Sequence, residues 1–274
     1  MRKHLTLVFI AVAALAAVLA GCSSEGSDRS DGSSTATDTA SIPPPITGSI
    51  IVSAASSLTE SFTTIRDDFV EANPDAEITI NFGSSGQLAT QITEGAPADV
   101  AAFADATPMT TLRDADLLSD TPQVFAKNRL VIVTKPGNPE NISSLADLAT
   151  AASEGTISLC VDTAPCGRFA DQILGSAGVE LPATSVSRGT DVKATLTAVT
   201  EGDADAAIVY VTDATAAGDA VTTVNIAESE NLIASYPIAV VAATSNAQLA
   251  EAFMAYVLGQ AGRQVLAGAG FLAP

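Results

Sequence analysis

The amino-acid sequence predicts an α/β fold with mostly parallel sheets, and three observations support that class. Short runs rich in β-branched residues alternate with amphipathic helical stripes from about residue 48 to the end of the chain. Most neighbouring strands are separated by a helix, which is the connection that parallel strands require. Glycine, serine and threonine gather where several strands end, as expected for turns that lead from a strand into a helix.

The first elements show the pattern clearly. Residues 49–52 predict a short β-branched strand. Four apolar residues from Leu58 to Phe69 then follow at spacings of four, three and four, which predicts a helix that ends at Asn73-Pro74. Further strands are predicted at residues 77–82, 99–104, 129–134, 156–161, 184–188, 206–211, 221–226 and 236–242. Further helices are predicted near residues 87–93, 108–113, 144–151, 167–174, 192–201 and 248–258.

The N-terminus has the pattern of an export signal. Arg2 and Lys3 precede an uncharged run over residues 5–19, which is too short to span a membrane comfortably but suits a signal peptide. Residues 19–22 (Leu-Ala-Gly-Cys) resemble the lipobox of bacterial lipoproteins, rather than an anchor helix with an incidental cysteine. We therefore expect residues 1–21 to be removed and Cys22 to carry lipid on the extracytoplasmic face of the cell membrane, because buried acyl methylenes contribute about 0.8 kcal/mol each.

The segment after Cys22 differs in composition from the rest. Residues 23–47 are rich in Ser, Thr, Asp and Gly and end in a run of three prolines at residues 43–45. This segment has too few apolar side chains to form a core. Residues 22–47 are therefore predicted to be the lipidated cysteine and a disordered linker with a reach of about 25–30 Å.

Composition excludes several kinds of function. The chain has 12 Lys+Arg against 31 Asp+Glu, a net charge of −19, so no nucleic-acid partner is expected. Its one histidine, His4, lies in the predicted signal peptide. The mature chain is therefore expected to contain no histidine, which excludes Ser-His-Asp catalysis, Cys-His catalysis and a His-ligated metal site.

The two cysteines of the folded part lie close together in the sequence. Cys160 and Cys166 are six positions apart in a chain that we expect to face an oxidising compartment. A disulfide worth about 2 kcal/mol is favoured for so small a loop. Two unpaired thiols remain the alternative, because short loops are often strained and the spacing alone does not decide.

Four predicted turns from a strand into a helix stand out, because ligands in such folds lie at the carboxyl ends of strands. The turns are residues 53–60, 82–88, 164–169 and 189–193. In the first, Ser57 and Glu60 match a capping box, and the local pattern alone favours a capping role for Ser57. The second lacks the Gly-x-Ser-x-Gly spacing of a nucleophile elbow and the Gly-Lys-Ser/Thr of a phosphate-binding loop. Together the four turns suggest one small anion held by helix N-termini, whose free N–H groups bind anions without Lys or Arg.

The same stretches resemble the periplasmic molybdate-binding proteins of ABC importers, a branch of the type II solute-binding proteins. The matching stretches are residues 54–58 (AASSL), 82–92 (FGSSGQLATQI), 95–100 (GAPADV), 165–167 (PCG), 191–193 (DVK), 207–214 (AIVYVTDA) and 236–241 (YPIAVV). They fall in order and cover nearly the whole chain from residue 49 onward.

The resemblance implies a set of binding residues. In that family two serines, two backbone amides at helix starts and one tyrosine hold the oxyanion. These roles fall on the hydroxyls of Ser57 and Ser85, the amides of Cys166 and Val192, and Tyr210. Because only its amide is implicated, the side chain of Cys166 stays free for a bridge to Cys160.

Three neighbouring residues leave the assignment partly open. Ser56 and Ser84 are the residues that a one-position shift in alignment would select. Gly86 stands where relatives often carry another serine, so this position offers no hydroxyl contact.

The resemblance also implies a two-lobed α/β fold with mixed sheets and a ligand cleft between the lobes. Lobe 1 is expected to comprise residues 48–128 and 236–274, and lobe 2 residues 129–235, with the predicted strands 129–134 and 236–242 crossing between them. Hinge closure would trap the ligand. The chain is expected to be a monomer without cofactor or enzymatic activity that passes its ligand to a membrane permease.

Ligand chemistry narrows the choice. Molybdate and tungstate are dianions with four acceptor oxygens and no donor, so a lining of N–H and O–H groups suits them, whereas hydrogen phosphate also needs an acceptor. Sulfate has the same demand as molybdate and stays an alternative. An ectoenzyme that uses paired carboxylates is less favoured, because no such pair lies near the four turns. A purely adhesive lipoprotein is the third alternative, and it would not bind oxyanions.

Overall fold

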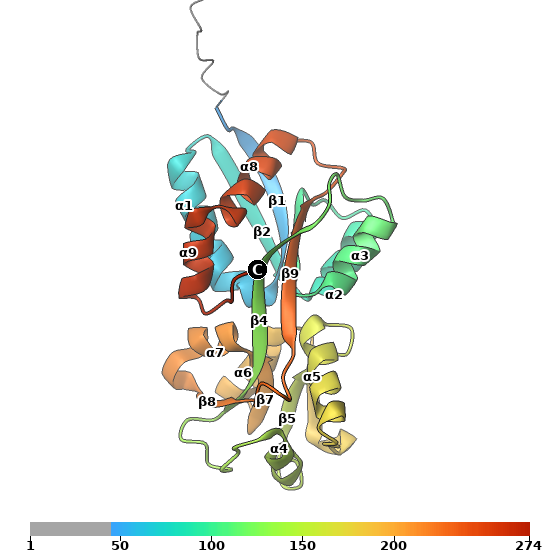
Figure 1. Ribbon diagram of the computed structural model, residues 1–274, viewed down its shortest axis with the longest axis vertical. Helices are drawn as coiled ribbons and strands as arrows, with labels where there is room; N and C mark the ends of the chain where they lie inside the picture. The colour runs from blue at the N-terminus through green and yellow to red at the C-terminus, as the bar shows by residue number, and fades with distance from the viewer. Residues whose placement is uncertain (1–44) are drawn as a thin grey trace, which may run out of the picture. The chain divides into compact units, whose positions relative to one another are not determined.

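The computed structural model describes residues 45–274, in which nine strands form one mixed sheet flanked by helices (Figure 1). The strand order is β2-β1-β3-β9-β4-β7-β5-β6, and β8 pairs with β4 beside this series. The predicted signal peptide, Cys22 and the linker up to residue 44 lie outside the described residues. Within residues 45–274, no helix is both long and apolar enough to cross a membrane.

The elements follow the predicted order, with two additional helices. The strands are β1 Gly48–Ala55, β2 Ala76–Gly83, β3 Val100–Ala102, β4 Gln123–Thr134, β5 Ile157–Cys160, β6 Val186–Gly189, β7 Ala206–Tyr210, β8 Thr222–Asn225 and β9 Ile233–Val240. The α-helices are α1 Thr59–Ala72, α2 Ser85–Thr93, α3 Ala106–Asp114, α4 Leu145–Ala151, α5 Pro165–Ser176, α6 Val192–Thr200, α7 Val211–Ala217, α8 Ala247–Leu258 and α9 Gln260–Gly268. Short 3₁₀ helices are η1 Ser56–Leu58, η2 Ala183–Ser185 and η3 Gly218–Ala220. Helices α7 and α9 were not predicted.

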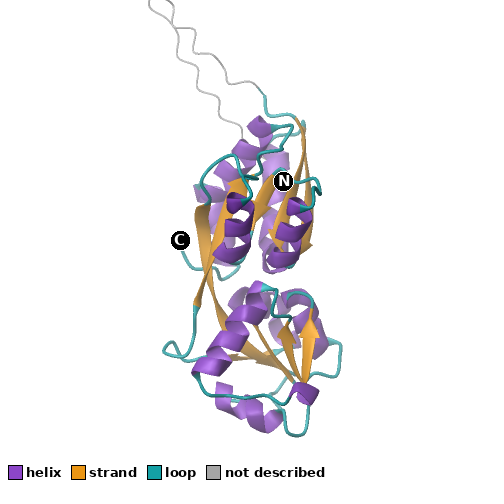
Figure 2. Ribbon diagram, turned by 90° about the vertical axis from the view of Figure 1, so that its right-hand side faces the viewer, coloured by secondary structure: helices purple, strands orange, loops and turns teal. Residues whose placement is uncertain are grey.

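Two strands connect the two lobes (Figures 1 and 2). Lobe 1 contains β1, β2 and β3 with α1, α2, α3, α8 and α9, and lobe 2 contains β5 to β8 with α4 to α7. The first half of β4 pairs with β9 up to Arg129, and from Leu130 the same strand pairs with β7 instead. Strand β4 is therefore longer than predicted, since it begins at Gln123 rather than at residue 129.

The sheet is mixed, as the resemblance implies, whereas the alternation of strands and helices alone favours mostly parallel pairing. The pairs β1–β2, β1–β3, β5–β6 and β5–β7 are parallel. The pairs β3–β9, β4–β9, β4–β7 and β4–β8 are antiparallel. The antiparallel pairs all involve β4 or β9, so the α/β units of each lobe keep parallel strands and the connecting strands run against them.

The predicted stripe of the first helix faces the core of lobe 1. Phe62 and Ile65 are fully buried, and Phe69 is 2 % exposed. Phe62 and Phe69 both contact the ring of Phe253 on α8 edge-on. Burying such side chains contributes about 1.5–3 kcal/mol each, and this packing positions the start of α1 against the end of β1.

Candidate functional site

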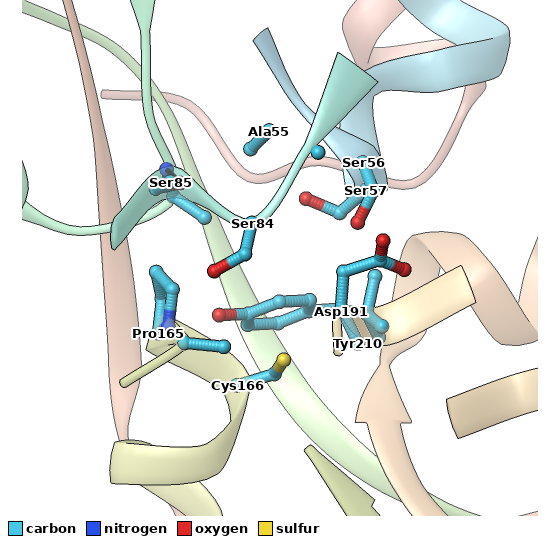
Figure 3. Close-up of a pocket in the computed structure, with 13 residues that line it drawn as sticks. Ala55, Ser56, Ser57, Ser84, Ser85, Pro165, Cys166, Asp191 and Tyr210 are labelled. Atoms are coloured by element: carbon cyan, nitrogen blue, oxygen red, sulfur yellow. Dashed lines mark hydrogen bonds between the residues drawn. The ribbon is translucent and has the colours of Figure 1, made fainter. Parts of the chain in front are cut away.

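A small cavity lies between the two lobes, where strands end and helices begin (Figure 3). It is much smaller than a hollow on lobe 1 that is lined by residues of β1 and β2 and of the segment before β3. Such a space suits a small ion rather than a sugar or peptide. The lining residues are Ala55, Ser56, Ser57, Gly83, Ser84, Ser85, Ala104, Ala164, Pro165, Cys166, Asp191, Val192 and Tyr210.

The structure brings all five predicted site residues to this cavity. Ser57 and Ser85 come from lobe 1, and Cys166, Val192 and Tyr210 come from lobe 2. The four turns named in the sequence therefore converge, each at the carboxyl end of a strand. The lining contains no Lys or Arg, so helix-start amides and hydroxyls are the available donors.

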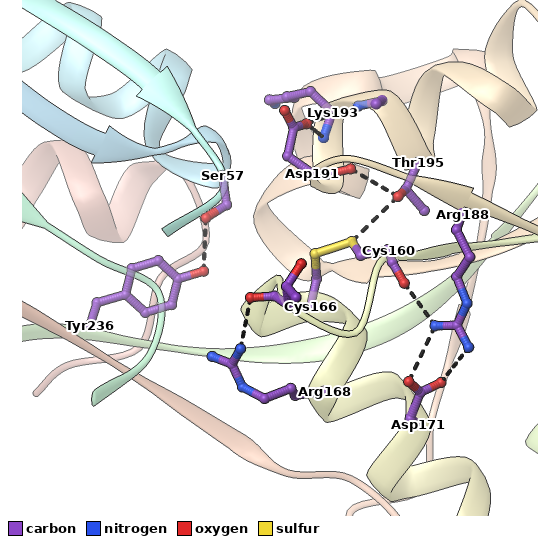
Figure 4. The surroundings of a disulfide bond; sticks show 12 residues. Ser57, Cys160, Cys166, Arg168, Asp171, Arg188, Asp191, Lys193, Thr195 and Tyr236 are labelled. Atoms are coloured by element: carbon purple, nitrogen blue, oxygen red, sulfur yellow. Dashed lines mark hydrogen bonds and ion pairs between the residues drawn. A yellow bond between two sulfur atoms is a disulfide. The ribbon is translucent and has the colours of Figure 1, made fainter. Parts of the chain in front are cut away.

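The capping role that the local pattern favours for Ser57 is wrong. Ser57 lies in η1, and α1 begins after Leu58 without a side-chain cap. The Ser57 hydroxyl instead lies 2.9 Å from the hydroxyl of Tyr236 on β9 (Figure 4). The Glu60 carboxylate is also turned away from the helix start, toward Lys193 of lobe 2. Tertiary contacts thus replace the local capping box at both of its positions.

Two serines at the start of α2 face the cavity. Ser85 is 1 % exposed, and its Oγ accepts a hydrogen bond from the backbone N–H of Ala104 at 3.1 Å. Ser84 is the N-cap residue of α2 but makes no side-chain cap. Its buried hydroxyl has no hydrogen-bond partner among residues 45–274, and Figure 3 shows it pointing into the cavity. The sequence named Ser84 only as a neighbour of Ser85, whereas the structure makes it a further candidate donor.

Lobe 2 offers backbone amides at two helix starts. Cys166 follows Pro165 in the first turn of α5, and Val192 is the first residue of α6. The first four N–H groups of a helix have no acceptor within it. The Asp191 carboxylate accepts hydrogen bonds from the amides of Lys193 and Ala194, so the Val192 amide is left for a ligand at the same turn.

A disulfide joins the end of β5 to the start of α5. It pairs Cys160 with Cys166, both of them buried (Figure 4). Arg188 donates to the Cys160 carbonyl oxygen at 2.8 Å and forms an ion pair with Asp171 on α5. These contacts hold the helix start that carries the Cys166 amide.

Tyr210 closes the cavity from the end of β7. Its side chain is 1 % exposed, and its hydroxyl has no hydrogen-bond partner in the described part of the chain. Burial is the main cause that raises the pKa of Tyr210 well above its ordinary value. The hydroxyl therefore keeps its proton at neutral pH and is available to donate to a ligand.

Gly86 explains a difference from the expected family pattern. A β-carbon at this position would lie 2.4 Å from the carbonyl oxygen of Thr163, which belongs to lobe 2. Any side chain at Gly86 would therefore push the lobes apart. The position expected to carry a serine hydroxyl instead forms a close backbone contact across the cleft.

Two groups of ion pairs connect the lobes near the cavity. Lys193 of lobe 2 lies 2.8 Å from the Glu60 carboxylate of lobe 1 and 3.1 Å from the fully buried Asp213. Burial lowers the pKa of Lys193, but Asp213 and Glu60 outweigh burial and the pKa is raised. Arg168 of lobe 2 pairs with Asp105, the N-cap residue of α3 in lobe 1. The cations near the cavity are thus engaged by carboxylates.

A two-lobed fold with a small donor-lined cavity between the lobes defines a class, that of the binding proteins that enclose a small solute. The family model of the bacterial extracellular solute-binding proteins matches residues 50–272, and this chain belongs to that family.

The chain is similar to individual proteins in sequence or in fold. The chain is 40 % identical over 226 residues to the molybdate-binding protein ModA of Mycobacterium tuberculosis, covering 82 % of this chain and 85 % of that protein. The periplasmic molybdate-binding protein of Azotobacter vinelandii superposes with a TM-score of 0.72 at 21 % identity, over 82 % of this chain and 99 % of that one. The sulfate-binding protein SubI of Mycobacterium tuberculosis also gives 0.72, at 19 % identity, over 81 % and 86 % of the two chains.

Proposed function

We propose that this protein is an extracytoplasmic solute-binding lipoprotein that captures molybdate, and also tungstate, for the permease of an ABC importer. The observation that carries the proposal is the cavity in which hydroxyls of lobe 1 face helix-start amides of lobe 2. Fully deprotonated tetrahedral dianions offer only acceptors, which matches this lining. The 40 % identity to a molybdate-binding protein supports the choice of anion.

The proposed mechanism is capture by closure, without covalent chemistry. Lobe 1 is taken as residues 48–128 with 236–274 and lobe 2 as residues 129–235, so that β4 and β9 bend as the hinge. Ser57, Ser85 and Tyr210 donate O–H groups, and Cys166 and Val192 donate backbone N–H groups. Asp191 is the one carboxylate of the lining and its Oδ1 is engaged by two amides, which argues against a hydrolase with paired acids.

The proposed location follows from the N-terminal pattern. After removal of residues 1–21, lipid on Cys22 would hold a monomer beside its permease, with residues 23–47 as the tether. The mass of the mature N-terminal peptide from cells tests this directly. A diacylglyceryl-modified Cys22 is expected, and an unmodified cysteine or an intact residue 21 would contradict it.

Sulfate is the second candidate, because it makes the same demand for donors and the fold superposes on a sulfate-binding protein. The experiment that decides is calorimetric titration of residues 45–274 with molybdate, tungstate, sulfate and phosphate. Molybdate and tungstate are expected to bind at least about tenfold more tightly than sulfate or phosphate, a difference of about 1.4 kcal/mol. Equal or tighter binding of sulfate would replace the molybdate proposal, and no binding of any of the four would overturn the oxyanion function.

A further inference from the structure

We infer that Tyr236 and Asn128, which do not line the cavity, are positioning residues that direct the proton of the Ser57 hydroxyl into it. This inference rests on the proposed oxyanion-binding function. It concerns a chain of buried hydrogen bonds behind Ser57, on the two strands that connect the lobes.

The chain begins at Asn128, whose amide orientation is defined by a backbone group. The Arg129 N–H can only donate, and it lies 2.9 Å from Oδ1 of Asn128. The other amide atom is therefore the NH₂ group, whose two protons are directed to the Thr212 hydroxyl at 2.9 Å and the Tyr236 hydroxyl at 3.4 Å. Asn128 is 1 % exposed, which leaves little room for competition from bulk water.

The direction passes from Asn128 to Tyr236. The Asn128 NH₂ group can only donate to the Tyr236 oxygen, so the Ser57 oxygen at 2.9 Å is the hydrogen-bonded neighbour that can accept the Tyr236 proton. Tyr236 is fully buried, and burial raises its pKa, so the proton stays on the tyrosine at neutral pH. Edge-on contacts of its ring with Phe125 and Phe271 hold the hydroxyl in place.

These hydrogen bonds leave the proton of the Ser57 hydroxyl directed into the cavity. Ser57 accepts from Tyr236 on the side away from the cavity, so its O–H points toward the ligand. Ser85 reaches the same state by a different route, because the Ala104 N–H can only donate to it. Ser57 and Ser85 are thus both donors, and a fully deprotonated oxyanion is favoured over one that carries a proton.

A double-mutant cycle tests the positioning role, with molybdate titrated calorimetrically into the wild type, Tyr236→Phe, Ser57→Ala and the double variant. Tyr236→Phe keeps the ring but removes the O–H, and we expect about tenfold weaker binding, because the Ser57 proton is then no longer directed to the charged ligand. The double variant should bind within about threefold of Ser57→Ala alone, because Tyr236 acts through Ser57. Tyr256→Phe, at a half-buried tyrosine of α8 outside the cavity lining, is the matched control and should bind as the wild type does.

A merely structural tyrosine would give different results. Fully additive losses in the double variant, or unchanged affinity of Tyr236→Phe, would overturn the inference. The ratio of molybdate to phosphate affinity is a second measure, expected to fall at least about threefold in Tyr236→Phe, since the freed Ser57 hydroxyl can then also accept. A wild type that binds no oxyanion overturns the proposed function and this inference together. A wild type that binds, with an unaffected Tyr236→Phe, overturns the inference alone.

Asn128→Asp is a second variant that tests the positioning role if Tyr236→Phe does not fold. The carboxylate is nearly isosteric with the amide but can only accept hydrogen bonds. It would therefore accept a hydrogen bond from the Tyr236 O–H, which reverses the direction of the hydrogen bonds behind Ser57. Ser57 would then donate to Tyr236 and turn a lone pair toward the anion. Binding weaker than in Ser57→Ala is expected, and binding equal to the wild type would contradict the inference.

Discussion

The two lobes meet the same ligand space with different chemistry. Lobe 1 contributes side-chain hydroxyls, from Ser57 at the end of β1 and from Ser84 and Ser85 after β2. Lobe 2 contributes mainly backbone, the amides at the starts of α5 and α6, with Tyr210 as its one hydroxyl. The lobe 1 wall of the cavity therefore donates through side chains, which substitutions can remove. The lobe 2 wall donates mainly through backbone amides, whose positions depend on where α5 and α6 begin.

The difference predicts that substitutions in lobe 1 have the largest effect. Ser57→Ala and Ser85→Ala should each weaken molybdate binding by about 1.5–3 kcal/mol, because each removes a hydrogen bond to a charged ligand. Calorimetry measures the loss. Ser61→Ala is the matched control. Ser61 is a buried serine of α1 that lies outside the cavity lining and donates to the Leu58 carbonyl oxygen. Unchanged affinity in both variants would remove the hydroxyls from the binding site.

The lobes also differ in their buried charge, and pH tests that difference. Asp213 of lobe 2 is fully buried, and burial raises its pKa to about 6 against the opposing effect of Lys193. The folded protein therefore keeps a proton on Asp213 between pH 4 and 6, where the unfolded chain has lost it. The stability that this group contributes is present near pH 4 and is lost as the pH rises to about 6.

Denaturant unfolding at pH 4 and pH 7 measures the effect. The free energy of unfolding of the wild type, relative to Asp213→Asn, should fall by about 2 kcal/mol between the two values. Asp219→Asn, at an exposed position in η3, is the control and should show little such change. A difference that rises with pH would mean that Lys193 lowers the pKa of Asp213 rather than only opposing the rise.

Gly86 tests whether the two walls must come together to bind. A methyl group at this position would lie 2.4 Å from the Thr163 carbonyl oxygen of the other lobe, whereas no obstacle that close arises within lobe 1. Gly86→Ala should therefore weaken molybdate binding about tenfold, while the ligand-free protein unfolds at nearly the wild-type temperature. Gly175→Ala, at an unobstructed helical glycine of α5, is the control. Wild-type affinity in Gly86→Ala would show that close contact at Thr163 is not needed.

Much of the fold could be predicted because most elements have strong periodic patterns. The stripe from Leu58 to Phe69 and the β-branched strands were located within a few residues. Helix α7 was missed because its alanines and threonines form no apolar stripe. Helix α9 was missed because it contains two glycines, which weaken a helix prediction. The first half of β4 was missed because it includes positions as exposed as Val124, so its pattern shows no clear period.

The candidate site could be predicted where the roles belong to recognisable turns. All five assigned residues meet at one cavity. What the sequence could not show depends on contacts between distant segments. Tyr236 lies 179 positions from the Ser57 hydroxyl that it contacts, and the local capping pattern pointed elsewhere. The role of Gly86 likewise depends on Thr163, which approaches only in the folded, two-lobed chain.

The smallest effect is expected at Cys166, where lobe 2 uses a residue without its side chain. Replacing both Cys160 and Cys166 by alanine removes the disulfide and leaves the backbone N–H of residue 166 at the start of α5. The melting temperature should fall, because a short disulfide loop contributes about 2 kcal/mol. Molybdate affinity at a temperature where the variant is folded should stay within about threefold of the wild type, because the amide needs only the helix start. A loss of more than about tenfold, about 1.4 kcal/mol, would mean that the disulfide itself holds the amide in register, and that the wall of lobe 2 depends on its side chains as the wall of lobe 1 does.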